Sequence, residues 1–115
     1  MSRGVFRAGD LVVADLDPVA GHEQGGRRPV LVLSGPSYNE LRNQQIIVAA
    51  ITSRQRGFPF HIPVGTDAGL RVPSWVQAET VRAISTERVA GRLGRAHPET
   101  LAEARRFVVN FLRDW

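Results

Sequence analysis

The sequence predicts an α+β fold in which a curled antiparallel sheet is followed by one C-terminal helix. Apolar runs of strand length, bounded by proline, glycine or polar residues, follow one another along most of the chain. The last segment instead repeats apolar residues at helical spacing, at Leu101, Ala104, Val108, Phe111 and Leu112. Pro98 and Glu99 suit the first turn of that helix. Several strands and then a terminal helix are typical of the α+β class.

The elements before this helix are expected as follows: strands at 10–17, 30–34 and 46–52, one helical turn at 38–41, an edge strand at 58–64, a turn at 67–73, extended structure at 74–84 and a short turn-rich segment at 85–95. Within the edge strand the apolar residues alternate, which puts His61 on the opposite, half-exposed face. Pro59 and Pro63 favour the edge position because neither can donate to a sheet ladder.

Length and composition indicate one globular domain, residues 1–115. A hydrophobic fraction of 43% argues against disorder. No apolar run approaches the roughly 18–20 residues of a membrane span, and the N-terminal residues lack the apolar core of a signal peptide. We therefore expect a cytoplasmic protein with no membrane partner. The absence of cysteine excludes disulfides and thiolate chemistry.

The formal net charge is +4, and all fifteen basic residues are arginine. A GC-rich genome favours arginine codons and is one explanation. The other is functional, because the guanidinium group binds phosphate in a planar, bidentate manner and stacks on bases. The charge favours an anionic partner, either RNA, DNA or an acidic protein.

Residues 21–29 (GHEQGGRRP) place glycines, charges and a proline between two apolar runs. Pro29 biases Arg28 toward an extended conformation, and an arginine held at the start of a strand is suited to gripping phosphate. A solvated hairpin loop is the alternative interpretation. If the second and third strands are antiparallel neighbours, Arg28 and Thr52 meet. A guanidinium and a hydroxyl at one point form a site for an oxyanion.

Metal and cofactor sites are not expected. The histidines, at positions 22, 61 and 97, lack the spacings of metal-binding motifs, and the glycine-rich loop lacks a nucleotide-binding fingerprint. His61 and His97 are interpreted as structural or solvated residues. His22 is a functional candidate because it lies beside Glu23 in the loop.

The chain resembles the MazF/PemK toxins, small ribonucleases of type II toxin–antitoxin systems. The resemblance covers nearly the whole chain and rests on these segments in order: GDLVVADLDP, GHEQGGRRPVLVLS, Tyr38-Asn39, AAITSR, GFPFHIPV, QAETVRAIS and PETL. It implies a homodimer of SH3-like, MazF/CcdB-like β-barrels with added helices. It also implies sequence-specific, metal-independent cleavage of single-stranded RNA to a 2′,3′-cyclic phosphate and a 5′-hydroxyl, which inhibits translation and growth. The implied protein partner is a cognate MazE-like antitoxin, and DNA is bound only through the antitoxin complex.

The resemblance assigns catalysis to Arg28 and Thr52 and gives Glu23 a supporting role. Arg27 occupies a position that varies within the family. Glu23 and His22 are the candidates for accepting the 2′ proton. The candidates for RNA binding are His22, Gln24, Arg27, Ser53, Arg54, Arg56, Gln77 and Glu79.

Two rival functions remain open. A CcdB-like toxin would have the same fold and would poison DNA gyrase. The Asp114-Trp115 pair suggests this alternative, because that family depends on its C-terminal end. A non-catalytic SH3-like module would bind RNA or a peptide without turnover. RNA cleavage by the purified protein separates both from the ribonuclease.

Overall fold

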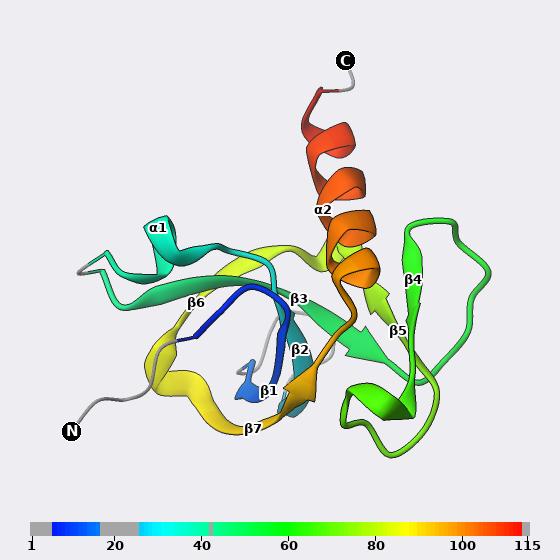
Figure 1. Cartoon of the computed structure of the whole chain (residues 1–115), viewed down its shortest axis with the longest axis horizontal. Coiled ribbons are helices and arrows are strands. Elements are labelled where there is room, and N and C mark those ends of the chain that lie inside the picture. The colour runs from blue at the N-terminus through cyan, green and yellow to red at the C-terminus, as the bar shows by residue number, and fades with distance from the viewer. Residues whose placement is uncertain (1–5, 17–25, 42, 114–115) are drawn as a thin grey trace.

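The computed structural model describes residues 6–16, 26–41 and 43–113 of the chain. In this part the chain forms a strongly curled sheet with a long helix at the C-terminal end (Figure 1). The strands are β1 (Asp10–Asp15), β2 (Arg27–Val32), β3 (Gln45–Thr52), β4 (His61–Val64), β5 (Ser74–Gln77), β6 (Arg82–Ser85) and β7 (Val89–Arg95). The helices are α1 (Pro36–Asn39) and α2 (Pro98–Arg113), with short 3-10 turns η1 (Thr66–Ala68), η2 (Ala78–Thr80) and η3 (Thr86–Arg88).

The sheet is antiparallel in every pair, with strand order β4-β5-β3-β2-β1-β7, and β6 pairs with β3 beside this path. β3 is the shared strand, because β6 pairs with its first half and β5 with its last two residues. The predicted α+β class, a curled antiparallel sheet with a C-terminal helix, is confirmed.

Two glycines allow the segment after β4 to fold back onto β7. Gly69 has φ +106°, and a Cβ atom there would lie 2.1 Å from the carbonyl oxygen of Leu93. A Cβ on Gly94 would lie 2.1 Å from the carbonyl oxygen of Ala68. The two backbones touch where any side chain would clash. This contact brings residues that follow the first sheet edge, β4, against the last strand, β7.

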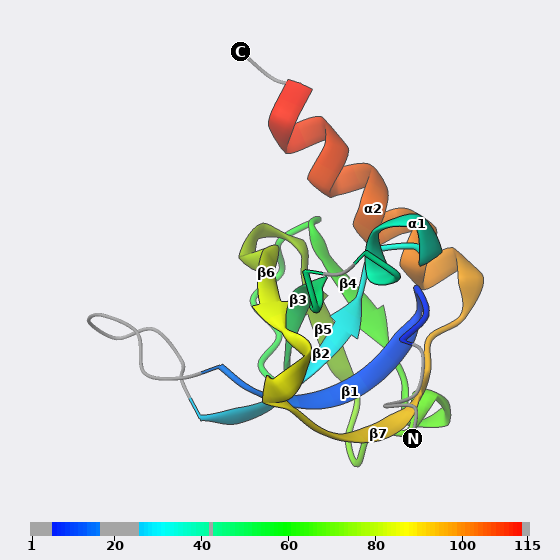
Figure 2. The same cartoon turned by 90° about the vertical axis from the view of Figure 1, so that its left-hand side faces the viewer.

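The hydrophobic core has two parts, because successive residues of a strand point to opposite faces. One part joins alternate residues of β1, β2 and β3 to β4, β5 and α2, with Leu11, Leu31, Ile51, Val76 and Ala104 among its members. The other joins the intervening residues to β6, with Val12, Val30, Val32, Val48 and Ile84. Helix α2 buries Ala104 and projects away from the sheet at its C-terminal end (Figure 2).

The prediction of a turn-rich segment at 85–95 is wrong. Residues 89–95 form β7, which pairs with β1 along its length. The glycines at 91 and 94 suggested turns, but here they lie in a strand whose pairing with β1 has two register shifts, where β7 carries one extra residue each time. Glycine in a strand often marks such a bulge or a close backbone approach. The segment 74–84 is extended, as predicted, except that η2 separates β5 from β6.

His61 is buried, and the prediction that it lies on a half-exposed face is wrong. The residue is 5% exposed, and its ring stands edge-on to Phe58 and Phe60 with centroids 5.2 and 5.3 Å apart. Its Nε2 atom lies 2.9 Å from a carboxylate oxygen of Glu79. Residues 58–60 precede β4, so the alternation across 58–64 does not continue through one strand. Phe58 is instead 47% exposed.

The remaining boundaries differ by a few residues. β2 begins at Arg27 and ends at Val32. The predicted strand was 30–34, so β2 begins three residues earlier than expected. Helix α1 occupies 36–39 instead of 38–41, and the hydrogen bonds that hold it begin at the Gly35 carbonyl. The strand predicted to start at residue 10 ends at Asp15. Residue 17, the predicted end of that strand, lies outside the described residues.

Candidate active site

Pro29 ends the hydrogen-bonded ladder between β2 and β3. The N–H of Leu33, just after β2, donates to the Ile47 carbonyl at 2.8 Å. Donors alternate sides along an antiparallel strand, so position 29 also directs its nitrogen toward β3. Proline has no N–H to donate there. The ladder accordingly stops at the pair Val30–Ala50.

This interruption places Arg28 across from Thr52. Continuing the register of the ladder by two residues beyond Val30–Ala50 sets these two positions opposite each other. By strand alternation both side chains belong to the face that carries Val30. The expectation that the second and third strands are antiparallel neighbours is confirmed. Thr52 itself pairs with Trp75 of β5, on the side of β3 away from β2.

The two side chains differ in burial and in bonding. Thr52 is 3% exposed, and its Oγ1 accepts a hydrogen bond from the Arg54 N–H at 3.1 Å, which leaves the hydroxyl hydrogen available to another acceptor. Arg28 is half-buried, and its Nε atom is buried with no hydrogen-bond partner among the described residues. A buried cationic donor without a partner is costly unless an anion satisfies it.

A cavity of about 370 Å³ opens where β2 and β3 cease to pair. It is lined by Val13, Arg27, Arg28, Pro29, Ile51, Ser53, Gly69, Leu70, Arg71, Val72, Ser74 and Leu93. By strand alternation Pro29 and Ile51 point to the face opposite that of Val30, so the cavity opens behind the Arg28–Thr52 position, although Arg28 also borders it. The structure thus brings together three of the predicted RNA-contacting or catalytic residues here, Arg27, Arg28 and Ser53.

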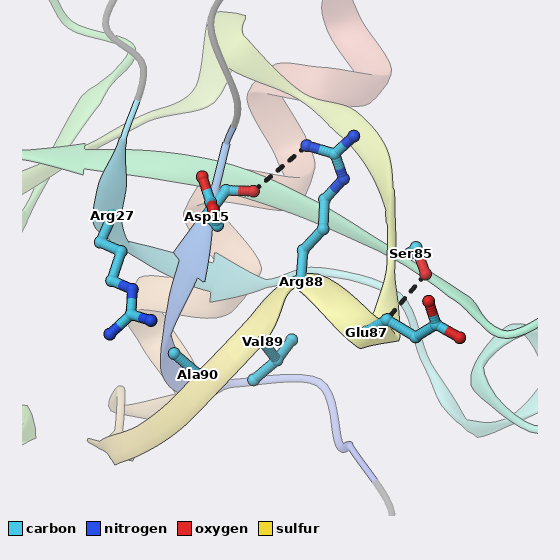
Figure 3. Close-up of a pocket in the computed structure, with 7 residues that line it drawn as sticks. All are labelled: Asp15, Arg27, Ser85, Glu87, Arg88, Val89 and Ala90. Carbon is cyan, nitrogen blue, oxygen red and sulfur yellow. Dashed lines mark hydrogen bonds between the residues drawn. The ribbon is translucent and has the colours of Figure 1, made fainter.

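A second hollow, of about 550 Å³, lies on the other side of Arg27. Its lining residues are Asp15, Arg27, Ser85, Glu87, Arg88, Val89 and Ala90. Figure 3 shows Arg27 and Arg88 projecting on either side of Asp15, whose backbone carbonyl accepts a 3.3 Å hydrogen bond from Arg88 Nη1. Arg27 therefore lines both hollows, and the second one carries the carboxylates of Asp15 and Glu87 as well as the two arginines.

The other predicted RNA-binding residues lie elsewhere or outside the described part. Arg54 and Arg56 are exposed in the segment after β3. Gln77 ends β5 opposite His61, and Glu79 is held by the His61 ring. Neither Gln77 nor Glu79 lines the two hollows. The loop residues His22, Glu23 and Gln24 lie outside the described residues.

Sequence reasoning missed Arg71 and Arg88, which line these hollows. Both lie in segments that the sequence marks as turns, with no motif around them. The available signal was weak, namely an arginine between apolar residues, as in Leu70-Arg71-Val72.

An exposed ion pair fastens η1 to the start of α2. The Nε2 atom of His97 lies 2.6 Å from Asp67 Oδ2. The hydrogen bond to Asp67 raises the pKa of His97, and the same bond lowers the pKa of Asp67. The sequence interpretation of His97 as structural or solvated agrees with this place at the surface. Residues 69–74, which form the outer wall of the cavity, follow η1 directly.

The described ranges contain no group of three or more histidine, aspartate or glutamate side chains placed to hold a metal ion. They also contain no helix that is both long and apolar enough to cross a membrane.

Comparison with known proteins gives one consistent result. Residues 7–112 match the model of the family described as PemK-like, MazF-like toxin of type II toxin-antitoxin system. The chain is similar to the endoribonuclease toxin ChpB of Escherichia coli K12, with 36% identity over 90% of this chain and 91% of that protein. It is similar to the crystal structure of MazF from Deinococcus radiodurans, with TM-score 0.84, 37% identity and coverage of 96% and 98%. It is also similar to a MazE-MazF structure from that organism, with TM-score 0.79, 35% identity and coverage of 97% and 99%.

Proposed function

Because the chain belongs to the PemK-like, MazF-like toxins of type II toxin–antitoxin systems, we propose that it is an endoribonuclease toxin. It cleaves single-stranded RNA at a short sequence, inhibits translation and growth, and is neutralised by a cognate antitoxin. Relatives named as endoribonucleases, at 33–36% identity, support this activity. The observation that supports the site assignment is the buried Arg28 Nε atom, which has no hydrogen-bond partner among the described residues, at the position that continues the register to Thr52.

The reaction is an internal transfer at phosphorus. The ribose 2′-oxygen attacks the adjacent phosphodiester and loses its proton, while the bond from phosphorus to the 5′-oxygen breaks. The products are a 2′,3′-cyclic phosphate and a 5′-hydroxyl, so neither a metal nor a cofactor is required. DNA lacks the attacking 2′-hydroxyl and is not cleaved.

Arg28 and Thr52 stabilise the charge that develops on the phosphoryl oxygens. The Arg28 guanidinium remains protonated, since an arginine pKa is above about 12, so it acts through electrostatics and hydrogen bonds. The Thr52 hydroxyl is held by the Arg54 N–H and donates one oriented hydrogen bond. Glu23 and His22 of the loop at 21–29 are the proposed acceptors of the 2′ proton.

The protein acts as a cytoplasmic homodimer of one domain per subunit, residues 1–115. Its protein partner is a MazE-like antitoxin with an acidic segment, which suits the +4 charge of this chain. The similar MazE-MazF structure supports a partner of this kind. Contact with DNA arises only through the antitoxin complex.

Cleavage of a long single-stranded transcript tests the activity and the site together. The wild-type protein should cut at a short sequence and leave cyclic phosphate ends, and a 2′-deoxy substitution at the scissile position should abolish the cut. Arg28→Ala and Thr52→Ala should each lose most activity, whereas Arg113→Ala, an equal charge change at the exposed end of α2, should not.

Four results would contradict the proposal. Near-normal rates in both variants would remove Arg28 and Thr52 from the site, and cleavage of the 2′-deoxy substrate would exclude cyclisation. Gyrase-dependent DNA breaks without RNA cleavage would favour the CcdB-like alternative, and RNA binding without turnover would favour the SH3-like binding module.

A further inference from the structure

Strand β3 changes its partner along one edge, just before Thr52. On this edge β6 pairs with residues 45–48 and β5 pairs with residues 51–52. Figure 1 shows β6 and β5 reaching β3 toward its opposite ends. Between β5 and β6 the chain runs through the 3-10 turn η2. The N–H groups of a strand alternate between its two edges, and that of Ala50 faces the gap between the two partners.

The Thr80 hydroxyl group fills this gap. It accepts a hydrogen bond from the Ala50 N–H at 2.8 Å and donates one to the Gln77 carbonyl at 2.7 Å. Extending the register of β3 with β5 by one residue sets Ala50 opposite Gln77, and extending the register with β6 by two residues sets Ala50 opposite Thr80. The hydroxyl, which can donate and accept at once, therefore joins the two ladders at a single residue of β3.

This bridge lies where the other edge of β3 also loses its partner. Ala50 pairs with Val30 of β2, and the ladder with β2 ends there. The path from the Ala50 N–H to the β5 carbonyl runs through two hydrogen bonds instead of one, so β5 diverges from β3 at Ala50 but stays paired with it at Thr52. The direction of the last residues of β3, and with it the place of Thr52 relative to Arg28, depends on this divergence.

We propose that Thr80 is a positioning residue for the Thr52 hydroxyl. Its bridge between Ala50 and Gln77 sets the direction in which β3 leaves its ladder with β2, and so aims Thr52 at the phosphate held by Arg28. Thr80 lines neither of the two hollows, so it acts through Thr52 and not on the substrate. The inference rests on the proposed ribonuclease function and deepens it, because small misplacements of a catalytic group slow a reaction strongly.

Ser34 offers a matched hydroxyl at the other end of β3. Its Oγ atom accepts a hydrogen bond from the Ile47 N–H at 2.9 Å. Removing this hydroxyl, like removing that of Thr80, leaves an N–H of β3 without its acceptor. Ile47 lies in the half of β3 that pairs with β6. Loss of the Ser34 bond should therefore destabilise the same strand without redirecting the end that carries Thr52.

The experiment compares Thr80→Val, Thr80→Ser and Ser34→Ala with the wild type on a single-stranded RNA that contains one mapped cleavage site. Valine replaces the hydroxyl group with a methyl group, whereas serine keeps the hydroxyl group. kcat and KM are measured per folded molecule, and urea unfolding gives the midpoint of each protein. Amide hydrogen exchange at Ala50 should be faster in Thr80→Val only, which checks that the intended bond is lost.

Thr80→Val should lower kcat about tenfold and change KM less than about twofold, because the RNA still binds but Thr52 is misplaced in the transition state. Thr80→Ser should return kcat to within about twofold of the wild type. Ser34→Ala should lower the urea midpoint, as Thr80→Val does, and leave kcat within about twofold of the wild type. In a Thr52→Ala background, Thr80→Val should cost less than about twofold in the single-turnover rate, since no hydroxyl remains there to be positioned.

Equal losses of kcat in Thr80→Val and Ser34→Ala would overturn the proposal, since Thr80 would then act through the stability of β3 alone. A loss that persists undiminished in the Thr52→Ala background would also overturn it. Failure of the proposed function has a different signature, because the wild type then cleaves no RNA. The NMR signal of the Thr52 methyl group still tests the bridge in that case: it should shift in Thr80→Val and not in Ser34→Ala, and an unchanged signal in both would exclude the positioning role.

Discussion

The two ends of β3 have different neighbours, and their chemistry differs accordingly. In the first half, Ile46 pairs with Ile84 of β6, and Val48 pairs both with β6 and with Val32 of β2. These side chains are buried and carry no polar group. At the other end Pro29 stops the pairing with β2, and a guanidinium and a hydroxyl occupy the open position. In this sheet, polar chemistry is found where the ladder is incomplete.

Ile46→Ala should destabilise the first half of β3, which pairs with β6, and leave the end of β3 that carries Thr52 intact. Loss of a fully buried side chain should lower the free energy of unfolding by about 2–5 kcal/mol. Urea unfolding measures this, and kcat/KM per folded molecule should be unchanged at low temperature. Arg28→Ala is the matched opposite: it should cost about 10²–10³ in kcat/KM and less than about 0.5 kcal/mol of stability. If both variants lost activity and stability in parallel, the division between the two ends would be false.

Pro29→Ala should make the Thr52 end of β3 resemble its first half, where the hydrogen-bonded ladder is complete. The new N–H faces β3 and can donate there, so the ladder extends toward Thr52 and narrows the gap that holds Arg28. We expect kcat/KM to fall about tenfold through misplacement of the catalytic groups. Amide hydrogen exchange should reveal a protected N–H at position 29. A freely exchanging amide would show that proline is not what interrupts the ladder.

His97→Asn should have the smallest effect, because the pair with Asp67 is exposed. The raised pKa of His97 means that its contribution to stability is complete below its ordinary value of 6.5 and is lost as pH rises through the folded value. The lowered pKa of Asp67 means that its contribution is present above 3.8 and is lost as pH falls through the folded value. The pair therefore stabilises the protein most between pH 3.8 and pH 6.5, the ordinary pKa values of the two groups.

Thermal unfolding of both proteins across this pH range provides the measurement. The advantage of the wild type over His97→Asn should be largest near pH 5 and shrink toward pH 8. An advantage that is constant with pH would show that the contact acts through packing alone. An increase toward pH 8 would contradict the sign of the His97 shift.

Several features were predictable because they are local or periodic. The apolar runs at 46–52 and the helical spacing from Leu101 to Leu112 identify β3 and α2 with little ambiguity. The Arg28–Thr52 pairing followed from an antiparallel arrangement of two adjacent strands. β7 was missed because its glycines are also typical of turns, and only the bulged pairing of β7 with β1 holds them in a strand.

The sequence by itself determined the strands at the start and middle of the chain, the terminal helix and the position of Arg28 and Thr52 at the ends of two neighbouring strands, because periodicity and the proline after Arg28 act over a few residues. Only the tertiary structure decided that His61 is buried and that Arg71, Val72 and Leu93 share a cavity with Arg28. The physical reason for the cavity is the backbone contact between Gly69 and Gly94, which joins distant segments of the chain, whereas His61 is buried by Phe58, Phe60 and Glu79. No local pattern records such a contact, and the outer wall of the cavity depends on it.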